Sequence, residues 1–135
     1  MKVLILTDRM GTGGAETHIA LLARGLARMG VEVTVLSGGG RIADELEREG
    51  IRQIRFPVSA CNPWLCLKLR RILKRLAQRE GYDLFHAHAR LPACLMRGLN
   101  RYGVAEIATV HAHFSVSPLL RRVCHWGSYT IAVSE

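Results

Sequence analysis

The sequence predicts an α/β protein of one domain, residues 1–135. Short apolar runs recur along the chain, and the first, Val3–Leu6, is continuous rather than alternating, as in a strand covered on both faces. Segments with helical periodicity separate these runs, and Gly30, Gly50 and Gly81 stand where such helices end. Because strands that alternate with helices pair in parallel, the pattern predicts a doubly wound, Rossmann-like parallel sheet of six strands.

The first strand, the first helix and the second strand occupy residues 3–36. Val3–Leu6 forms the first strand, the glycine-rich loop Gly11–Gly14 turns the chain, and Val31–Leu36 forms the second strand. The helix between them has one apolar stripe, formed by Ala15, Ile19, Leu22, Leu26 and Met29. A strand, a helix and a second strand within about thirty residues form a βαβ unit.

Four further helices and four further strands follow. The helices are expected at residues 41–49, 63–79, 91–102 and 117–126, and the strands at residues 51–58, 82–88, 106–110 and 129–133. Asn62-Pro63 and Ser117-Pro118 each supply an N-cap residue followed by proline at the first helical position. In the strand order 3-2-1-4-5-6 of this fold, the first and fourth strands are neighbours at the point where ligands bind.

The glycine-rich loop Gly11–Gly14 is a candidate ligand site. Glycine lets the backbone turn sharply and lets N–H groups approach a ligand, and the N-terminus of the following helix points to the same spot. Such a loop suits a phosphate, a carboxylate or sugar hydroxyls; the alternative is a tight turn that binds nothing. Glu16 stands where the dinucleotide-binding fingerprint needs its third glycine, and the second strand runs into Ser37 and Gly38 rather than an acidic residue. No Lys-Ser/Thr pair follows the glycines, so the phosphate-binding P-loop motif is absent too.

Two His-x-His pairs, His86/His88 and His111/His113, follow the fourth and fifth strands. In the expected strand order the first pair faces the glycine-rich loop and the second pair lies next to it. Two such pairs form a zinc site when their side chains converge. Because the chain turns at both strand ends, hydrogen bonds between neutral imidazoles and ligand hydroxyls are the preferred interpretation, and no metal is expected. Structural roles are expected for His18, His86 and His125.

The net charge of +8 indicates an anionic partner or surface. Basic residues crowd the expected helix at residues 63–79, and the candidates for anion binding are Lys68, Arg71, Lys74 and Arg75. One interpretation is a solvated helix face. The other is a patch that binds anionic lipid headgroups or a phosphate-bearing acceptor, which Trp64 at the start of the helix favours. No nucleic-acid-binding motif accompanies the charge, so nucleic acid is not an expected partner.

The first apolar run is too short for a signal peptide, and no run has the length of a membrane-spanning helix. The sequence therefore predicts a cytoplasmic protein, peripheral on the inner face of the membrane if the basic helix binds lipid. The four cysteines lack C-x-x-C spacing, so free thiols are expected at Cys61, Cys66, Cys94 and Cys124.

Five segments of the chain carry a family resemblance. In order, they are Lys2–Leu6, Gly13–Glu16, Asp83–His88, Thr109–His111 and Ile131–Glu135. Together they resemble the N-terminal domain of retaining GT-B glycosyltransferases of family 4. The resemblance extends over the whole chain, with the segments in the family's order.

The resemblance implies one half of a two-domain enzyme that transfers sugar from a nucleotide-activated donor to an acceptor. In the family, the N-terminal half mainly binds the acceptor, and its glycine loop, here Gly13 and Gly14, approaches both the acceptor and the donor phosphate. His111, in the Thr-x-His triplet, is expected beside the donor sugar as the catalytic candidate. Glu16, His88 and His113 are further substrate-binding candidates. The nucleotide sugar is a substrate rather than a cofactor, and transfer usually needs no metal ion.

The family's C-terminal half binds the donor nucleotide and carries a Glu-x₇-Glu motif, and this sequence does not contain it. Residues 1–135 alone are therefore expected to fold without transferring sugar. One alternative is a non-catalytic acceptor-binding or membrane-docking subunit, with the donor domain on a partner chain. The other is a small nucleotide-binding domain, which the absent third glycine and absent acidic residue disfavour.

Overall fold

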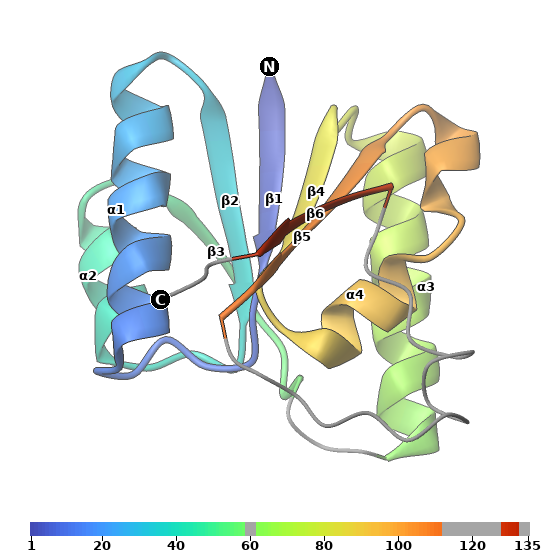
Figure 1. Ribbon diagram of the computed structural model, residues 1–135, viewed down its shortest axis with the longest axis horizontal. Helices are drawn as coiled ribbons and strands as arrows, with labels where there is room; N and C mark the ends of the chain where they lie inside the picture. The colour runs from blue at the N-terminus through green and yellow to red at the C-terminus, as the bar shows by residue number, and fades with distance from the viewer. Residues whose placement is uncertain (59–61, 112–127, 133–135) are drawn as a thin grey trace.

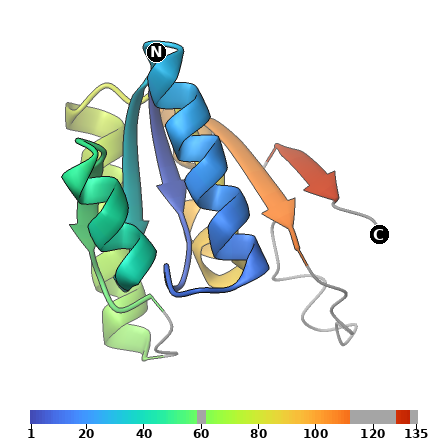
Figure 2. The ribbon, with the colours of Figure 1, turned by 90° about the vertical axis from the view of Figure 1, so that its left-hand side faces the viewer.

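The computed structural model describes residues 1–58, 62–111 and 128–132. In this part of the chain, six strands form one sheet in the order β3-β2-β1-β4-β5-β6, as the sequence predicts. All neighbouring strands run parallel (Figure 2). The strands are β1 (Lys2–Leu6), β2 (Glu32–Ser37), β3 (Arg52–Arg55), β4 (Leu84–Ala87), β5 (Ala105–Val110) and β6 (Tyr129–Ala132).

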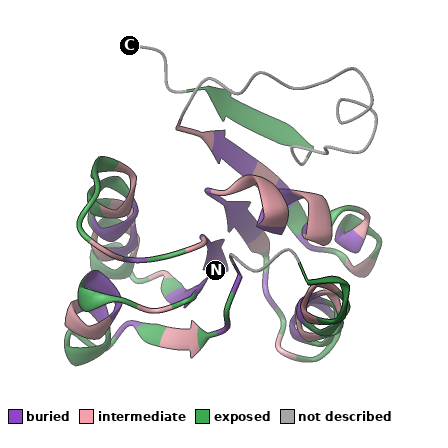
Figure 3. Cartoon of the chain, turned by 90° about the horizontal axis from the view of Figure 1, so that it is seen from below, coloured by how far each residue is buried: buried purple, intermediate pink, exposed green. Residues whose placement is uncertain are grey.

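Helices cover both faces of the sheet (Figure 1). The helical elements are α1 (Gly14–Arg28), α2 (Arg41–Arg48), α3 (Pro63–Arg79), α4 (Arg90–Met96) and the 3₁₀ helix η1 (Leu99–Tyr102). Alternate residues of β1 enter two separate cores: Val3 and Ile5 pack with α1 and α2, while Leu4 and Leu6 pack with α3 and α4. Burial is therefore concentrated on the central strands, whereas β6 is exposed (Figure 3). None of the described helices is long and apolar enough to cross a membrane.

The helix predicted at residues 91–102 is in fact two elements. Arg97 leaves the helical region, with φ −46° and ψ 126°, and Gly98 adopts a left-handed conformation with φ +74°. The guanidinium of Arg70, on α3, donates hydrogen bonds to the carbonyl oxygens of Leu95 and Arg97, the latter at 2.7 Å. These bonds satisfy carbonyls that a continuous helix would have used, so α4 ends before η1 begins.

Two further predictions on the elements need correction. Met29 was expected in the buried stripe of α1, but the helix ends at Arg28 and Met29 is 80% exposed. The third strand was expected at residues 51–58, but β3 ends at Arg55, which pairs with Ser37, the last residue of its neighbour β2. The predicted helix at residues 117–126 lies outside the described residues, as does Val133 of the last predicted strand.

The loop after β1 is fixed to the start of α2. The Met10 N–H donates to the Gly39 carbonyl at 3.0 Å, and the Ile42 N–H donates to the Met10 carbonyl at 3.0 Å. Gly40 has φ +136°, and a Cβ there would collide with the Met10 carbonyl, so only glycine fits. This attachment holds the chain that leads from β1 into α1 at the carboxyl edge of the sheet.

Candidate functional site

Three elements meet at the carboxyl edge of the sheet. β1 and β4 pair in parallel with Leu6 beside Ala87, and the His88 N–H donates to the Leu6 carbonyl at 2.7 Å. His88 follows β4, His111 follows β5, and the first turns of α1 start beyond β1. This is the switch point of the strand order, where ligands bind in doubly wound folds.

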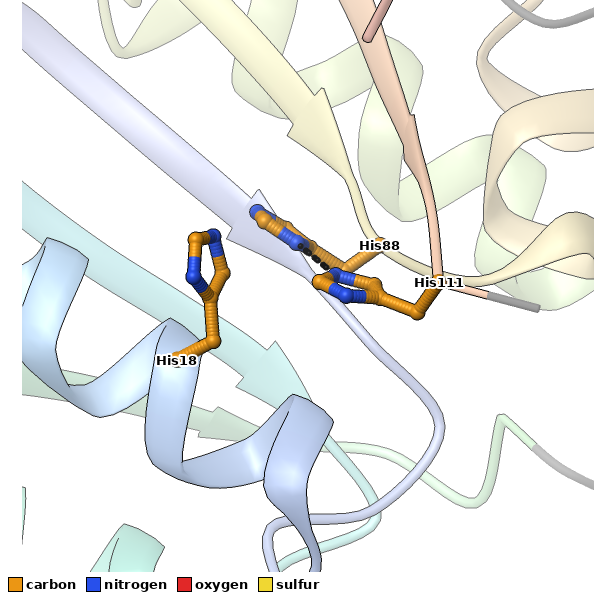
Figure 4. A group of neighbouring side chains, drawn as sticks. All are labelled: His18, His88 and His111. Carbon is orange, nitrogen blue, oxygen red and sulfur yellow. Dashed lines mark hydrogen bonds between the residues drawn. The ribbon is translucent and has the colours of Figure 1, made fainter. Parts of the chain in front are cut away.

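His88 and His111 form a hydrogen-bonded pair. His88 Nδ1 lies 2.9 Å from His111 Nε2, and the ring centroids are 5.2 Å apart at an interplanar angle of 23° (Figure 4). The bond needs a proton on one of these two nitrogens and a lone pair on the other. His88 is buried and His111 is half-buried, so the pair is held in place while His111 remains accessible.

His18, from α1, is the third histidine of this cluster. Its ring centroid lies 5.9 Å from that of His88 and 5.2 Å from that of His111, and its side chain points toward both (Figure 4). The predicted structural role of His18 is therefore wrong: the residue is exposed at the site rather than packed away from it. Its position one helical turn after Gly14 is the sequence signal that could have placed it there.

His86 supports the cluster from within the sheet. Its Nε2 lies 2.7 Å from the Thr109 hydroxyl, and both residues are buried. Its ring centroid is 4.2 Å from that of His88. The prediction of a packed and hydrogen-bonded His86 is confirmed.

His86, His88 and His111 favour the neutral form. Burial, followed by the influence of His86, His111 and His18, lowers the pKa of His88 to about 2. Burial, followed by His18 and His111, lowers the pKa of His86 to about 4. The pKa of His111 is lowered mainly by burial and then by His18, while Glu16 opposes the shift. At neutral pH these imidazoles therefore act as hydrogen-bonding groups or metal ligands rather than as cations.

The glycines at the start of α1 have ordinary backbone conformations. Among the described residues, positive φ angles occur at other glycines, and Gly13, the N-cap of α1, has φ −86°. The expectation that Gly11, Gly13 and Gly14 serve the backbone angles of the turn is therefore wrong. A Cβ on Gly13 would collide with the Glu16 carboxylate, whereas a Cβ on Gly14 would meet no atom of the described residues within 4 Å. Neither the backbone angles of the turn nor packing requires glycine at position 14. The absence of a side chain there leaves space beside the N-terminus of α1.

Glu16 shares this end of α1. Its carboxylate lies beside Gly13 in the first turn, where the positive end of the helix dipole favours a negative charge. Its negative charge also acts on the histidine cluster, where it raises the pKa of His111 against the effect of burial. An anionic ligand at Gly13 and Gly14 must therefore share this position with Glu16 or displace it.

A metal ion is the other group that these residues could hold. One ring nitrogen from each of His18, His88 and His111 lies within 4.8 Å of the other two. Among the described residues, this is the one such group of histidine, cysteine or acidic side chains. Cys66 is a free thiol, as predicted.

The family follows from a match that includes the loop and both His-x-His pairs. A family model described as Glycosyltransferase Family 4 matches residues 12–135. The chain belongs to glycosyltransferase family 4. None of the curated proteins compared with the chain matches it.

Solved glycosyltransferase structures share the fold. A glycosyltransferase from Rickettsia africae aligns with a TM-score of 0.73 at 17% identity, over 90% of this chain and 32% of its own. MurG of Acinetobacter baumannii aligns with a TM-score of 0.69 at 17% identity, over 99% of this chain and 41% of its own. HepE of Anabaena, in complex with UDP-glucose, aligns with a TM-score of 0.61 at 19% identity, over 85% of this chain and 32% of its own. The chain thus spans less than half of these proteins and has the fold of the N-terminal half of a GT-B glycosyltransferase.

The structure brings together most of the predicted site of this family 4 domain. His88 and His111 are in contact, and Glu16 lies at the start of α1 beside Gly13. His113, which was also predicted to bind substrate, lies outside the described residues, as do His125, Cys61 and Cys124.

The predicted anion-binding residues lie on α3. Lys68, Arg71, Lys74 and Arg75 are all exposed, and among the described residues none of them forms an ion pair. Other arginines of the domain are neutralised: Arg24 pairs with Glu49, Arg52 with Glu80, and Arg55 with Asp44 and Glu47. The unneutralised side of α3, which we call the basic face, therefore carries a concentrated positive charge.

Proposed function

We propose that this domain is the acceptor-binding half of a retaining glycosyltransferase that uses a nucleotide-activated sugar. The observation that carries the proposal is the open N-terminus of α1 at Gly14, placed at the same sheet edge as the His88–His111 pair. N–H groups at a helix start bind phosphate or hydroxyl oxygens, and a neutral imidazole binds sugar hydroxyls. Membership of family 4 supports this assignment, and UDP-glucose bound to the structurally similar HepE supports the class of donor.

Each residue of the site has a distinct role in this proposal. Gly13 and Gly14 expose backbone N–H groups to the acceptor and to the donor diphosphate, and Glu16 binds a substrate hydroxyl. The hydrogen bond between His111 Nε2 and His88 Nδ1 fixes the His111 ring and leaves Nδ1 of His111 for the donor sugar. His88 is thus a positioning residue, and His113 is a further candidate for substrate contact. No step of this scheme uses a metal ion.

Residues 1–135 are proposed to need a donor-binding half. The glycine loop and His111 supply only part of the charge stabilisation that a departing nucleoside diphosphate requires. A second half that closes over them would fix the donor against the acceptor and exclude water. The Rickettsia glycosyltransferase, MurG and HepE are each more than twice as long as the part aligned here, which supports such a division.

Membrane docking is a second proposed function, favoured by the composition of the basic face. Trp64 is 79% exposed and Leu67 is 43% exposed. At 100° per residue, these two side chains fall within the same third of the helix as Lys68, Arg71 and Arg75. Exposed apolar groups flanked by cations suit the interface of an anionic membrane. We place the domain at the cytoplasmic face of a membrane, where it would meet a lipid-linked acceptor.

A transfer assay tests the proposed enzyme. The 135-residue chain is assayed with a panel of nucleotide sugars, alone and together with a separately expressed family 4 donor-binding half. We expect no turnover by the chain alone and turnover by the pair. His111→Ala should lower turnover by about 100-fold, since one polar group beside the reacting centre contributes on that order. Its thermal unfolding temperature should fall only modestly, because His111 is half-buried and its loss leaves Nδ1 of the buried His88 without this hydrogen bond.

Three outcomes contradict this account. Turnover by the 135-residue chain alone would remove the need for a second half. Full activity of the His111→Ala variant would show that His111 has no role in transfer. Loss of activity on addition of a chelator would show that transfer itself needs a metal ion.

A further inference from the structure

The histidine cluster has a property that sugar binding does not require. Its three members come from separate elements, since His18 lies on α1, His88 after β4 and His111 after β5. One ring nitrogen of each lies within 4.8 Å of those of the other two (Figure 4). Convergence of three nitrogen ligands from three elements is the arrangement of a transition-metal site with an open fourth position.

A second observation points to the same site. Nε2 of His88 is buried and has no hydrogen-bond partner in the described part of the chain. The whole residue is only 7% exposed, so its imidazole is held at a fixed position by the surrounding sheet. A buried polar atom without a partner is unfavourable, and ligation of an ion at a ring nitrogen is one way to satisfy it.

Binding an ion replaces the hydrogen bond between His88 Nδ1 and His111 Nε2, because in either tautomer that bond leaves one of the two rings without a free lone pair for the metal. Tetrahedral zinc with Zn–N bonds of about 2.0–2.1 Å places its ligand nitrogens about 3.3 Å apart. His18 is exposed on a helix surface, so rotation of its side chain can shorten the distances to the other two rings. The Glu16 carboxylate on the same helix turn adds a negative charge that favours a cation.

We propose that His18, His88 and His111 form a binding site for Zn²⁺. Imidazole nitrogens favour zinc and its neighbours in the transition series, whereas Mg²⁺ and Ca²⁺ prefer oxygen ligands. The fourth ligand is water or an anion. If the proposed function is correct, an ion bound to His111 withholds this residue from the donor sugar, so zinc inhibits transfer and a chelator restores it.

The test uses the 135-residue protein and metal salts alone. Zn²⁺ is titrated against a chromophoric chelator to obtain the stoichiometry and affinity, and Co²⁺ binding is followed by its visible absorption, which reports the coordination geometry. We expect one ion per chain, an absorption typical of nitrogen ligands and no competition by Mg²⁺. His18→Ala should weaken Zn²⁺ binding by at least about tenfold, the lower bound for disturbing a zinc site. His18→Cys, which keeps a soft ligand, should recover much of the affinity.

His18 carries the test because it is exposed and its replacement leaves the core intact, whereas replacement of the buried His88 could unfold the protein. His111→Ala is the second ligand variant and should also weaken binding. Cys66→Ser, which removes a half-buried thiol of α3, is the control and should bind Zn²⁺ like the parent. Equal affinity of the parent, His18→Ala and His111→Ala would overturn the proposal. Because no sugar is present, that result would leave the proposed glycosyl transfer standing.

Discussion

The fold does not explain the glycine at position 14, at the start of α1. Its φ angle is not positive, and among the described residues no atom lies within 4 Å of the place that a methyl group would take. A glycine at a helix start that neither the turn nor the packing requires is best understood through what approaches it from solvent. Gly25, in the middle of the same helix, is also surrounded by open space but lies away from the helix N-terminus. Replacing each of the two glycines by alanine therefore separates an effect on ligand binding from an effect on the stability of the helix.

Gly14→Ala should weaken ligand binding, whereas Gly25→Ala should leave it unchanged. Neither variant should lose stability, and Gly25→Ala should gain about 0.5–1 kcal/mol because alanine favours a helix interior. Only Gly14→Ala should weaken binding of nucleotide sugar, because its methyl group occupies the space beside the N–H groups. The measurements are denaturant unfolding and ligand titration of both variants. Equal ligand affinity of the two variants would indicate that the loop is a tight turn that binds no ligand.

The buried histidines predict how stability depends on pH. His86 and His88 stay neutral in the folded protein because burial lowers their pKa to about 4 and about 2. In the unfolded chain the pKa of histidine is about 6.5, so below that pH the unfolded state binds protons that the folded state does not. The free energy of unfolding should therefore fall as the pH falls from 7 to 5, by on the order of 1 kcal/mol per pH unit for each histidine. His111 adds to this slope, because burial and then His18 lower its pKa as well, while Glu16 opposes the shift.

Denaturant unfolding at pH 7, 6 and 5, with a chelator present, measures this dependence. The variant His86→Gln keeps a group that can hydrogen-bond Thr109 but has no titrating ring. Its slope should be smaller than that of the parent by the share of one histidine. An unchanged slope would mean that His86 does not titrate as its burial implies.

At the scale of single elements, α3 was predicted accurately and α4 was not. α3 starts at Pro63 as expected, and the Asn62 side chain accepts a hydrogen bond from the Trp64 N–H at 3.0 Å. These signals lie in adjacent residues, so the sequence contains all the information that they need. The end of α4 depends instead on Arg70, which reaches from α3 to the carbonyls of Leu95 and Arg97. A contact between two elements does not produce a periodic pattern in the sequence of either element, so the sequence does not predict it.

The basic face of α3 makes a prediction about membranes. Each lysine or arginine near an anionic surface contributes about 1 kcal/mol to binding, so neutralising four of them should lower the affinity by at least about 100-fold. The variant replaces Lys68, Arg71, Lys74 and Arg75 with glutamine. Sedimentation with vesicles of phosphatidylserine and phosphatidylcholine is the measurement, and high salt should weaken binding by the parent.

A matched control separates the face from the net charge. Arg71→Gln/Arg75→Gln and Arg28→Gln/Arg48→Gln remove the same charge, but Arg28 and Arg48 end α1 and α2, on the other side of the sheet. Only the first pair should lose vesicle binding. Equal losses in both pairs would indicate a general charge effect, and no binding by the parent would leave the basic face simply solvated.

At the scale of the whole molecule, the topology was predictable and the site was predictable in part. The strand order follows from alternating strands and helices, and it places His88 beside His111. His18 was not expected at the site. Its position one helical turn after Gly14 places it near the loop, but the approach of its ring to the two strand ends depends on how α1 crosses the sheet. The sequence also predicted that Gly14 serves a sharp turn of the backbone, but its φ angle is not positive.

The central claim is that substrates bind where the start of α1 meets the histidine pair. The most direct measurement is an NMR titration of the isotope-labelled chain with a panel of nucleoside diphosphates and nucleotide sugars, with metals chelated. Our account predicts weak binding, with shifts at the Gly13 and Gly14 amides and at the His111 ring, while Gly25 stays unchanged. Shifts confined to the basic face of α3, or none at millimolar ligand, would contradict it.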